Sequence, residues 1–258
     1  MKNFLLIIAV VFVFAACNCG PKLQRTTIVY DAHHLDSSWV QLPCNYAKAS
    51  DTSHYPLLVF FHGIGEAAND GGLNVMLTLG PPKYMADSIR FSFANANKIY
   101  NFIVFCPQDF DGYRTPQNVN AILDYIVAHY RVDQSRIYLT GLSAGARNCL
   151  NYVTESQAYA NRIAAIVPMS SIVMDAAHTS HFNYVANANV HTRIFIGTSD
   201  ATNLSNNQTY ANAINALSPG LAEFTTYAGG HCCWNGPYST NHDFYNPNIY
   251  EWMLQFHK

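Results

Sequence analysis

The chain has 258 residues, half of them apolar and 14% aromatic, so it is long enough to build one large domain around a sizeable core. Charged residues make up only 12%, and the formal net charge is -2. This composition argues against nucleic acid as a partner, because phosphate binding needs clustered Lys and Arg. Frequent Asn and Tyr with low charge suit an exported protein that handles neutral polar material such as carbohydrate.

The N-terminus predicts an export signal. Lys2 precedes an apolar stretch over residues 4–14, which is too short and has the wrong flanks for a transmembrane helix. Two alanines then lead to Cys17, which resembles a bacterial lipobox although Phe14 stands where Leu is usual. We expect residues 1–17 to be a signal peptide with Cys17 lipidated, which would place the protein in the periplasm or on the cell surface. Ordinary signal cleavage and secretion are the alternative.

No internal repeat, low-complexity tract or charged linker interrupts the rest of the chain. We therefore expect residues 18–25 to form a short tether and residues 26–258 to form a single domain. The lipid on Cys17 would be the only contact with a membrane.

Six further cysteines follow Cys17, and in an oxidising compartment some of them are expected to pair. They are Cys19, Cys44, Cys106, Cys149, Cys232 and Cys233. The sequence does not determine which of the possible pairings forms. Cys106 lies in an apolar run, which indicates a buried free thiol. No His/Cys spacing indicates a zinc site, so no metal is predicted.

The predicted elements alternate between strands and helices. Apolar runs predict strands at 26–30, 55–63, 101–108, 135–141, 162–171, 192–200 and 221–231. Helical spacing predicts helices within 115–133, from 144, over 206–217 and over 246–258, and residues 64–100 are expected to hold a loop with a short helix. This alternation predicts a mostly parallel sheet with helices on both faces, and sites in such sheets gather at the carboxyl ends of the strands.

The pentapeptide GLSAG at 141–145 stands between a predicted strand and a predicted helix. A serine on such a sharp turn is exposed, and side chains at Gly141 and Gly145 would clash with the neighbouring strand and helix. The helix N-terminus favours developing negative charge, and the N–H of Ala144 can hold an oxyanion. We therefore predict that Ser143 is a nucleophile. A plain tight turn of small residues is the alternative.

A serine nucleophile needs a base and an acid. His231 follows the last predicted strand after a Gly pair, whereas His62, the competing base, ends an early strand where it is expected to shape the loop. Asp200 closes the preceding strand and gives the chain order Ser, Asp, His. Asp175 is the alternative acid, and Asp243 fits poorly because it follows the histidine.

The second oxyanion donor should be a backbone N–H just after the early strand at 55–63. The segment HGIGE supplies this group, with Ile64 as the expected donor and Gly65 as the alternative.

Five ordered motifs, VFFHGIGE, CPQ, VDQSRIYLTGLSAGA, GTSD and GGHCCW, together resemble the α/β-hydrolase superfamily. More narrowly, the chain is similar to secreted feruloyl esterases, acetylxylan esterases and polyhydroxyalkanoate depolymerases, a group that includes chains described as peptidases. The residues AAND after HGIGE and the doubled cysteine depart from the commonest forms. The resemblance implies an α/β-hydrolase fold and a serine hydrolase that acts on esters through an acyl-enzyme. Ser143, Asp200 and His231 take the places of the triad.

Two features near His231 allow alternatives. Trp234 either lines the acyl pocket or packs beneath the loop that carries His231. Cys232 and Cys233 could link this loop to Cys149, form a vicinal disulfide, or remain free thiols.

Only about twenty residues join the strand that ends near Ser171 to the one that ends at Asp200, which leaves no room for a sizeable cap domain. An open site suits a small ester or an acylated polysaccharide, so we expect a carboxylic-ester hydrolase that removes feruloyl or acetyl groups from carbohydrate. A serine peptidase of the same fold and a non-catalytic surface lipoprotein that binds glycan are the alternatives. No cofactor is implied.

Overall fold

The computed structural model describes residues 22–29, 35–48, 50 and 52–258. The expected signal peptide, its lipidated Cys17 and most of the expected tether lie outside the described residues. The main sheet has eight strands in the order β1-β2-β6-β3-β7-β8-β9-β10. These strands are β1 (Leu23–Val29), β2 (Leu35–Gln41), β3 (Tyr55–Phe61), β6 (Ile103–Gln108), β7 (Val132–Leu142), β8 (Ala165–Met169), β9 (His191–Gly197) and β10 (Ala222–Tyr227).

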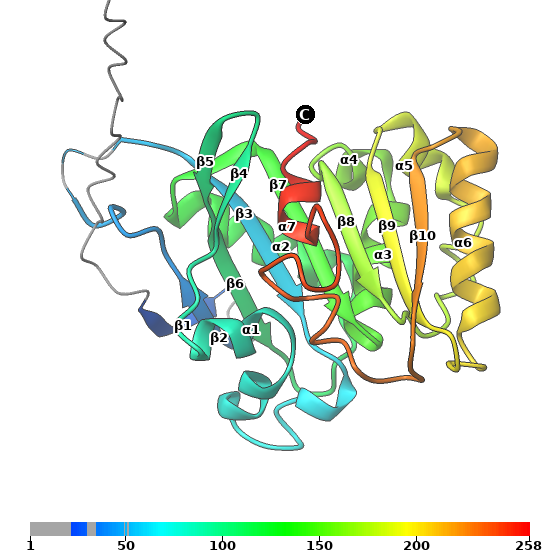
Figure 1. Cartoon of the computed structure of the whole chain (residues 1–258), viewed down its shortest axis with the longest axis horizontal. Helices are drawn as coiled ribbons and strands as arrows, with labels where there is room; N and C mark the ends of the chain where they lie inside the picture. Colours follow the sequence, from blue (N-terminus) through cyan, green and yellow to red (C-terminus); the bar gives the residue numbers. More distant parts are fainter. Residues whose placement is uncertain (1–21, 30–34, 49, 51) are drawn as a thin grey trace, which may run out of the picture.

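The sheet is mostly parallel, as the sequence predicted. From β6 to β10 every neighbouring pair runs parallel, whereas β2 near one edge pairs antiparallel with both β1 and β6. In the central register, Val59 of β3 pairs with Phe105 of β6 and with Leu139 of β7. The carboxyl ends of the parallel strands therefore share one edge of the sheet, the lower one in Figure 1.

Helices and a small hairpin cover the sheet. The helices are α1 (Gly80–Ala86), α2 (Pro116–His129), α3 (Ala144–Glu155), α4 (Gln157–Ala160), α5 (Phe182–Asn187), α6 (Leu204–Leu217) and α7 (Ile249–Met253). The hairpin pairs β4 (Ser92–Asn95) with β5 (Lys98–Asn101), and two 3-10 helices are η1 (Ile64–Glu66) and η2 (Leu73–Thr78). Figure 1 shows α1 and α7 in front of the sheet. No described helix is long and apolar enough to cross a membrane.

Two hydrophobic cores, one on each face, hold these layers together. Side chains alternate along a strand, so in β3 Leu57, Val59 and Phe61 join one core while Leu58 and Phe60 join the other. The first core includes buried side chains of α2, α3, α5 and α6, and the second includes those of α1, β4 and α7. Because β3 is buried on both faces, its sequence is a continuous apolar run rather than an alternating one.

The helix α2 shows how local sequence sets an element. The hydroxyl of Thr115 accepts a hydrogen bond from the N–H of Asn118, and Pro116 occupies the first turn, where its missing N–H costs nothing. The buried residues of this helix, Val119, Ile122, Leu123 and Ile126, recur at helical spacing. They pack in the first core with side chains of β3 and β7. The helix predicted from the spacing of these residues is therefore confirmed.

Three expectations differ from the structure. The helix predicted over 246–258 is the short α7, because the side chain of Asn248 caps the N–H groups of Tyr250 and Glu251 and so starts the helix there. The strand β2 was not predicted, because three consecutive polar residues, Asp36, Ser37 and Ser38, leave Leu35–Gln41 with neither an apolar run nor a regular alternation. The β4–β5 hairpin was also missed within the expected loop.

The connection between β8 and β9 is short. Residues 170–190 contain only α5 among helices and strands. The expectation that no sizeable cap domain stands between these strands is therefore confirmed for this segment, and the carboxyl edge of the sheet lies open there.

Candidate active site

β7 ends directly at Ser143, which occupies a turn before α3. This serine has φ 55° and ψ -116°, a conformation that costs energy for any residue except glycine. Its N–H donates to the carbonyl of Met169 in β8 at 2.9 Å, which fixes the turn against the sheet. A strained, buried serine between a strand and a helix has the geometry of a nucleophile elbow.

Two glycines allow the elbow to pack closely. A Cβ on Gly141 would lie 2.5 Å from the carbonyl of Gly145 and 2.7 Å from the carbonyl oxygen of Phe61. A Cβ on Gly145 would overlap the same Phe61 carbonyl even more closely. The clash with strand and helix that the sequence predicted is therefore confirmed, and α3 can lie directly against the end of β3.

His231 and Asp200 meet Ser143 at this edge. The Nε2 of His231 lies 2.8 Å from the Oγ of Ser143, and its Nδ1 lies 2.7 Å from Oδ2 of Asp200. Asp200 is 4% exposed, in the turn after β9, and His231 lies in the loop after β10. A carboxylate beside Nδ1 favours the tautomer with its proton there, which leaves Nε2 free to accept the proton of the serine.

Asn203 also holds the acid, and the sequence gave no indication of this role. Its Nδ2 donates to Oδ1 of Asp200 at 2.9 Å, so both carboxylate oxygens of Asp200 have partners. Asn207, one turn further along α6, donates to the carbonyls of Ser171 and Asn203 and holds this corner to the end of β8. No signal in the sequence distinguishes Asn203 from the many other asparagines of the chain.

Two backbone N–H groups face the same serine. Ala144 begins α3, so its N–H has no partner inside the helix. Ile64 begins η1, and a Cβ on the preceding Gly63 would lie 3.3 Å from the Cβ of Ser143. No described residue accepts a hydrogen bond from either N–H. Gly65, the alternative donor, is one residue further along the chain from Gly63, the residue that lies beside Ser143.

His62 orients the Ile64 N–H. The Nδ1 of His62 lies 2.6 Å from the carbonyl oxygen of Gly63, to which it donates, and the N–H of Asp109 donates to Nε2 at 3.1 Å. In a trans peptide the carbonyl and the N–H point in opposite directions, so holding the Gly63 carbonyl also directs the N–H of Ile64. His62 thus lies where a residue that shapes the loop is expected, and its ring nitrogens are engaged away from Ser143.

The alternative acids lie elsewhere. Asp175 forms an ion pair with Arg147 and accepts a hydrogen bond from Asn151, both on α3. Asp243 accepts from the amide of Asn241 at 2.6 Å in an exposed loop. The histidine partner of the serine therefore contacts Asp200 and neither of these two residues.

The cysteines near His231 differ from one expectation. Cys232 and Cys233 form a vicinal disulfide with each other, while Cys149 is a buried free thiol. Of the three alternatives left open by the sequence, the structure therefore has the vicinal disulfide and not the link to Cys149. The physical reason is that Cys149 faces into the first core, where burial raises the pKa of its thiol, whereas the doublet is exposed in the loop. Cys106 is the buried free thiol that the sequence predicted.

Trp234 packs beside the base. Its ring meets the ring of His231 edge to face at 5.2 Å between centroids, and the side chain belongs to the second core. Its Nε1 is buried without a hydrogen-bond partner among the described residues. A buried donor without a partner is uncommon in folded proteins.

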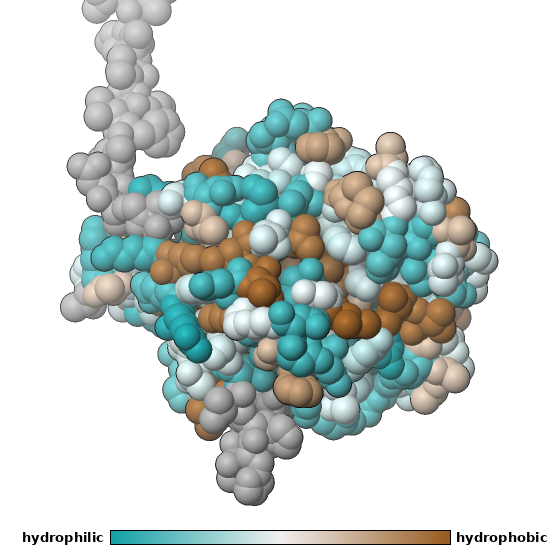
Figure 2. Space-filling view, turned by 90° about the horizontal axis from the view of Figure 1, so that it is seen from below, coloured by the Kyte–Doolittle hydropathy of each residue, from teal (hydrophilic) through white to brown (hydrophobic). Residues whose placement is uncertain are grey.

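A cleft of about 660 Å³ opens beside His231. Figure 2 views this end of the molecule and shows a band of apolar side chains crossing a polar surface. The other lining residues are Tyr113, Arg147, Ile172, Val173, Asp200, Thr202 and Asn203. Tyr113 and Val173 are about half exposed, and the guanidinium of Arg147 lies 5.0 Å from the centre of the Tyr113 ring. Within the described residues, no group of three or more His, Cys, Asp or Glu side chains could hold a metal ion.

No protein-family model matches this sequence, and no curated protein matches it either. Solved structures do match. A thermostable esterase has a TM-score of 0.66 at 19% identity, over 92% of this chain and 63% of its own. The feruloyl esterase module of Clostridium thermocellum, an S954A mutant in complex with sinapinate, has a TM-score of 0.61 at 15% identity, over 92% of this chain and 88% of its own. Porphyromonas gingivalis dipeptidyl peptidase 4 has a TM-score of 0.60 at 13% identity, over 92% of this chain and 36% of its own.

The chain spans less than two thirds of the length of the thermostable esterase and about one third of the peptidase. At such low identity these matches establish the fold. The chain has the α/β-hydrolase fold, and its structural neighbours are esterases and dipeptidyl peptidases.

Proposed function

We propose that this protein is a serine hydrolase that cleaves carboxylic esters through an acyl-enzyme. The observation that carries the proposal is the unbroken hydrogen-bonded chain from Ser143 through His231 to Asp200. Side chains that come from three different loops of the sheet share this chain, at distances of 2.7 and 2.8 Å. Two inward-facing N–H groups beside the serine complete the set of groups that acyl transfer requires.

In the acylation step, the Oγ of Ser143 attacks the ester carbonyl carbon while Nε2 of His231 takes the hydroxyl proton. The carbonyl oxygen becomes an oxyanion, and the N–H groups of Ala144 and Ile64 donate to it. Asp200 stabilises the imidazolium that forms. His231 then gives its proton to the departing alcohol oxygen as the carbon–oxygen bond breaks, which leaves the acyl group on Ser143.

In the deacylation step, water takes the place of the alcohol. His231 removes a proton from the water, whose oxygen attacks the acyl carbon and regenerates the oxyanion in the same pair of N–H groups. Collapse of this intermediate returns the proton to Ser143 and releases the acid. Each group therefore serves twice, and no cofactor takes part in the proposed mechanism.

The substrate class follows from the cleft. Its volume of about 660 Å³ is larger than an acetyl group needs, and Tyr113, Ile172 and Val173 offer apolar surface for an acyl chain or ring. We therefore favour an aromatic acyl group of the feruloyl type, attached to carbohydrate, over acetyl. Trp234 does not line this cleft and its Nε1 is buried, so of the two alternatives for this residue we favour packing beneath the loop that carries His231.

The expected export signal fits this assignment. If Cys17 carries a lipid, the residues between it and β1 tether the catalytic domain to the periplasmic or cell-surface side of a membrane, where acylated polysaccharides are accessible. The expected tether of residues 18–25 is shortened in this proposal, because Leu23–Val29 forms β1 of the main sheet. Ordinary signal cleavage would release the same enzyme into the medium.

The alternative hypothesis, that the protein is a serine peptidase, rests on the dipeptidyl peptidase neighbours, which share the fold. The chain covers only about a third of that peptidase, so most of that protein has no counterpart here. Comparing hydrolysis of p-nitrophenyl esters with hydrolysis of aminoacyl-anilides separates the two activities.

The test uses the purified protein with p-nitrophenyl acetate, methyl ferulate and a feruloylated arabinoside, and with a fluorophosphonate probe that labels activated serines. We expect turnover of all three esters, labelling of the protein, and loss of both in Ser143→Ala. Activity or labelling retained in Ser143→Ala would overturn the assignment. An intact, folded protein that neither turns over nor labels would favour the non-catalytic glycan-binding alternative.

A further inference from the structure

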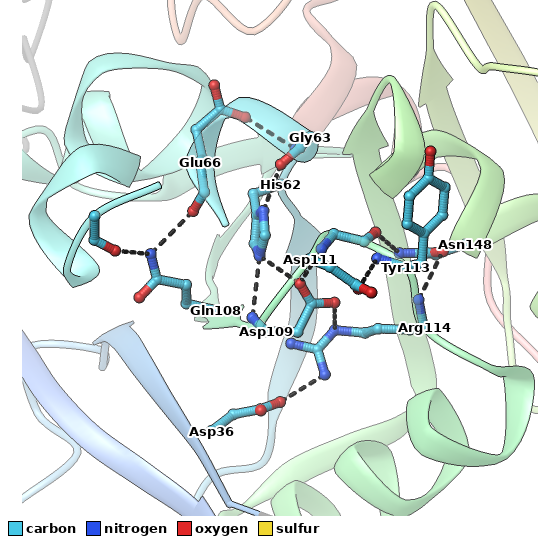
Figure 3. Close-up of polar contacts among 12 residues, drawn as sticks. Asp36, His62, Gly63, Glu66, Gln108, Asp109, Asp111, Tyr113, Arg114 and Asn148 are labelled. Atoms are coloured by element: carbon cyan, nitrogen blue, oxygen red, sulfur yellow. Dashed lines mark hydrogen bonds and ion pairs between the residues drawn. The ribbon is translucent and has the colours of Figure 1, made fainter. Parts of the chain in front are cut away.

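Asn148 connects two segments that carry the proposed oxyanion donors. It lies on α3, five residues after Ser143, and is 1% exposed. Its Nδ2 donates to the carbonyl of Gly112 at 3.0 Å, and its Oδ1 accepts from the N–H of Arg114 at 3.2 Å. The amide therefore ties α3 to the segment at 109–114, which follows β6 and which we call the clamp loop. Figure 3 shows Asn148 beside this loop.

The clamp loop lies directly against the Ile64 peptide. Gly112 has φ +86°, and a Cβ on it would lie 3.2 Å from Cα of Ile64 and 3.3 Å from its nitrogen. Only glycine adopts this conformation readily and allows so close an approach. A shift of the clamp loop would therefore move the Ile64 N–H.

Asp109, the first residue of the clamp loop, also stabilises it. It accepts from the N–H of Gly112 at 2.5 Å, and its carboxylate lies 3.1 Å from Nε2 of His62 and 3.2 Å from Nε of Arg114. Burial alone would raise the pKa of Asp109, but the charge of Arg114 and the hydrogen bond from the N–H of Gly112 lower it below its ordinary value. Arg114 also pairs with Asp36 of β2 at 2.6 Å, as Figure 3 shows.

The two donors belong to separate segments. The N–H of Ala144 moves with α3, whereas the N–H of Ile64 moves with the loop after β3. An oxyanion hole works because its donors are already in place before charge develops. The distance between the two N–H groups must therefore be fixed by contacts between the two segments. Asn148 is buried and makes both of its hydrogen bonds to the clamp loop, which in turn contacts Ile64.

We propose that Asn148 is a positioning residue of the oxyanion hole, whose amide sets the distance between the two donors by holding the clamp loop to the helix that follows Ser143. This role rests on the proposed function. Asn148 touches no reacting atom, so its loss should act on the transition state. Tyr113 of the clamp loop lines the cleft, so the test uses p-nitrophenyl acetate, whose small acetyl group does not depend on that apolar surface.

The experiment compares Asn148→Ala with Tyr152→Phe. Tyr152 is a matched control because it lies on the same helix, is fully buried and ties α3 to Asn120 of α2 through one hydrogen bond, away from Ser143. For Asn148→Ala we expect kcat to fall by about 10- to 100-fold, less than the roughly 100- to 1000-fold loss for removing one oxyanion donor, because the donor is displaced and not removed. KM for p-nitrophenyl acetate should change little, and the affinity for a trifluoromethyl ketone, which forms a tetrahedral adduct with the serine, should fall by the same factor as kcat. The control should retain kcat.

A second variant covers the case in which Asn148→Ala does not fold. Asn148→Asp keeps the shape and the bond from Arg114, but it places a carboxylate oxygen against the carbonyl of Gly112, and the same losses are expected. The proposal is wrong if either folded variant loses no more kcat than Tyr152→Phe, or loses kcat without losing affinity for the ketone. Failure of the proposed function would look different, because wild-type protein itself would neither turn over esters nor label with the fluorophosphonate.

Discussion

The substitution Asp200→Asn tests the triad most sharply, because the structure predicts which way the new amide will face. Asn203 donates to Oδ1 of Asp200, and that bond favours placing the amide oxygen of the new residue there. The NH₂ group then takes the place of Oδ2, which lies 2.7 Å from Nδ1 of His231. Nδ1 must accept from it, so the proton of His231 moves to Nε2, which can no longer take the proton of Ser143.

The expected loss is large. Removing a carboxylate charge about 4 Å from a developing imidazolium costs about 4 kcal/mol at an effective dielectric constant of 20, which is roughly three powers of ten in rate. Stabilising the wrong tautomer adds to this, and the equivalent substitution in a Ser-His-Asp triad lowers kcat by roughly 10⁴. We therefore expect kcat to fall by about 10³- to 10⁴-fold while the protein stays folded.

The assay is steady-state hydrolysis of p-nitrophenyl acetate, with the acylation burst measured separately and folding checked by thermal denaturation. The double variant Asp200→Asn with Asn203→Asp provides the decisive comparison. A carboxylate at 203 accepts from the NH₂ of the amide at 200 and turns the amide oxygen toward Nδ1 of His231, so activity should recover at least partly. A single variant with near-wild-type kcat, or a double variant no faster than the single one, would refute the reasoning.

Three further outcomes are expected. Cys232→Ser with Cys233→Ser should leave the melting temperature nearly unchanged in calorimetry, because a bond between adjacent residues removes little entropy from the unfolded chain; a large drop would contradict this. The lowered pKa of Asp109 stabilises the fold above its ordinary value of 3.8, and this contribution is lost as pH falls through the folded pKa, so Asp109→Asn should flatten the acid side of a plot of urea midpoint against pH. Trp234→Phe should leave KM for feruloyl esters nearly unchanged, because Trp234 packs in the second core and does not line the cleft; a severalfold rise in KM would show that its Nε1 contacts the substrate.

The strand pattern predicted most of the site because parallel strands end at one edge of a sheet. Ser143, Asp200 and His231 are far apart in sequence, yet each follows an apolar run that ends in small or polar residues. Once the runs are placed side by side, the three residues must lie near one another. The order of the strands along the sheet was not needed for this inference, which is why it succeeded without knowledge of β2.

Polar contacts that occur once leave no such pattern. Asn203 resembles any other asparagine in a chain that is rich in them, and its role depends on where α6 begins relative to Asp200. The cysteine pairing stayed open for the same reason. Nothing in the sequence shows that Cys149 on α3 faces the core and that Cys232 and Cys233 bond to each other.

The contacts of the clamp loop are of the kind that sequence patterns do not predict. Asp36 and Arg114 are 78 residues apart in the chain, and Asn148 is 36 residues from Gly112, so neither contact follows from periodicity. The patterns that are visible in the sequence identify the groups that we propose to react. The separation of the two oxyanion donors depends instead on buried amide and ion-pair contacts between loops. Sequence patterns are therefore expected to locate the chemistry of such a site more readily than the residues that set its rate.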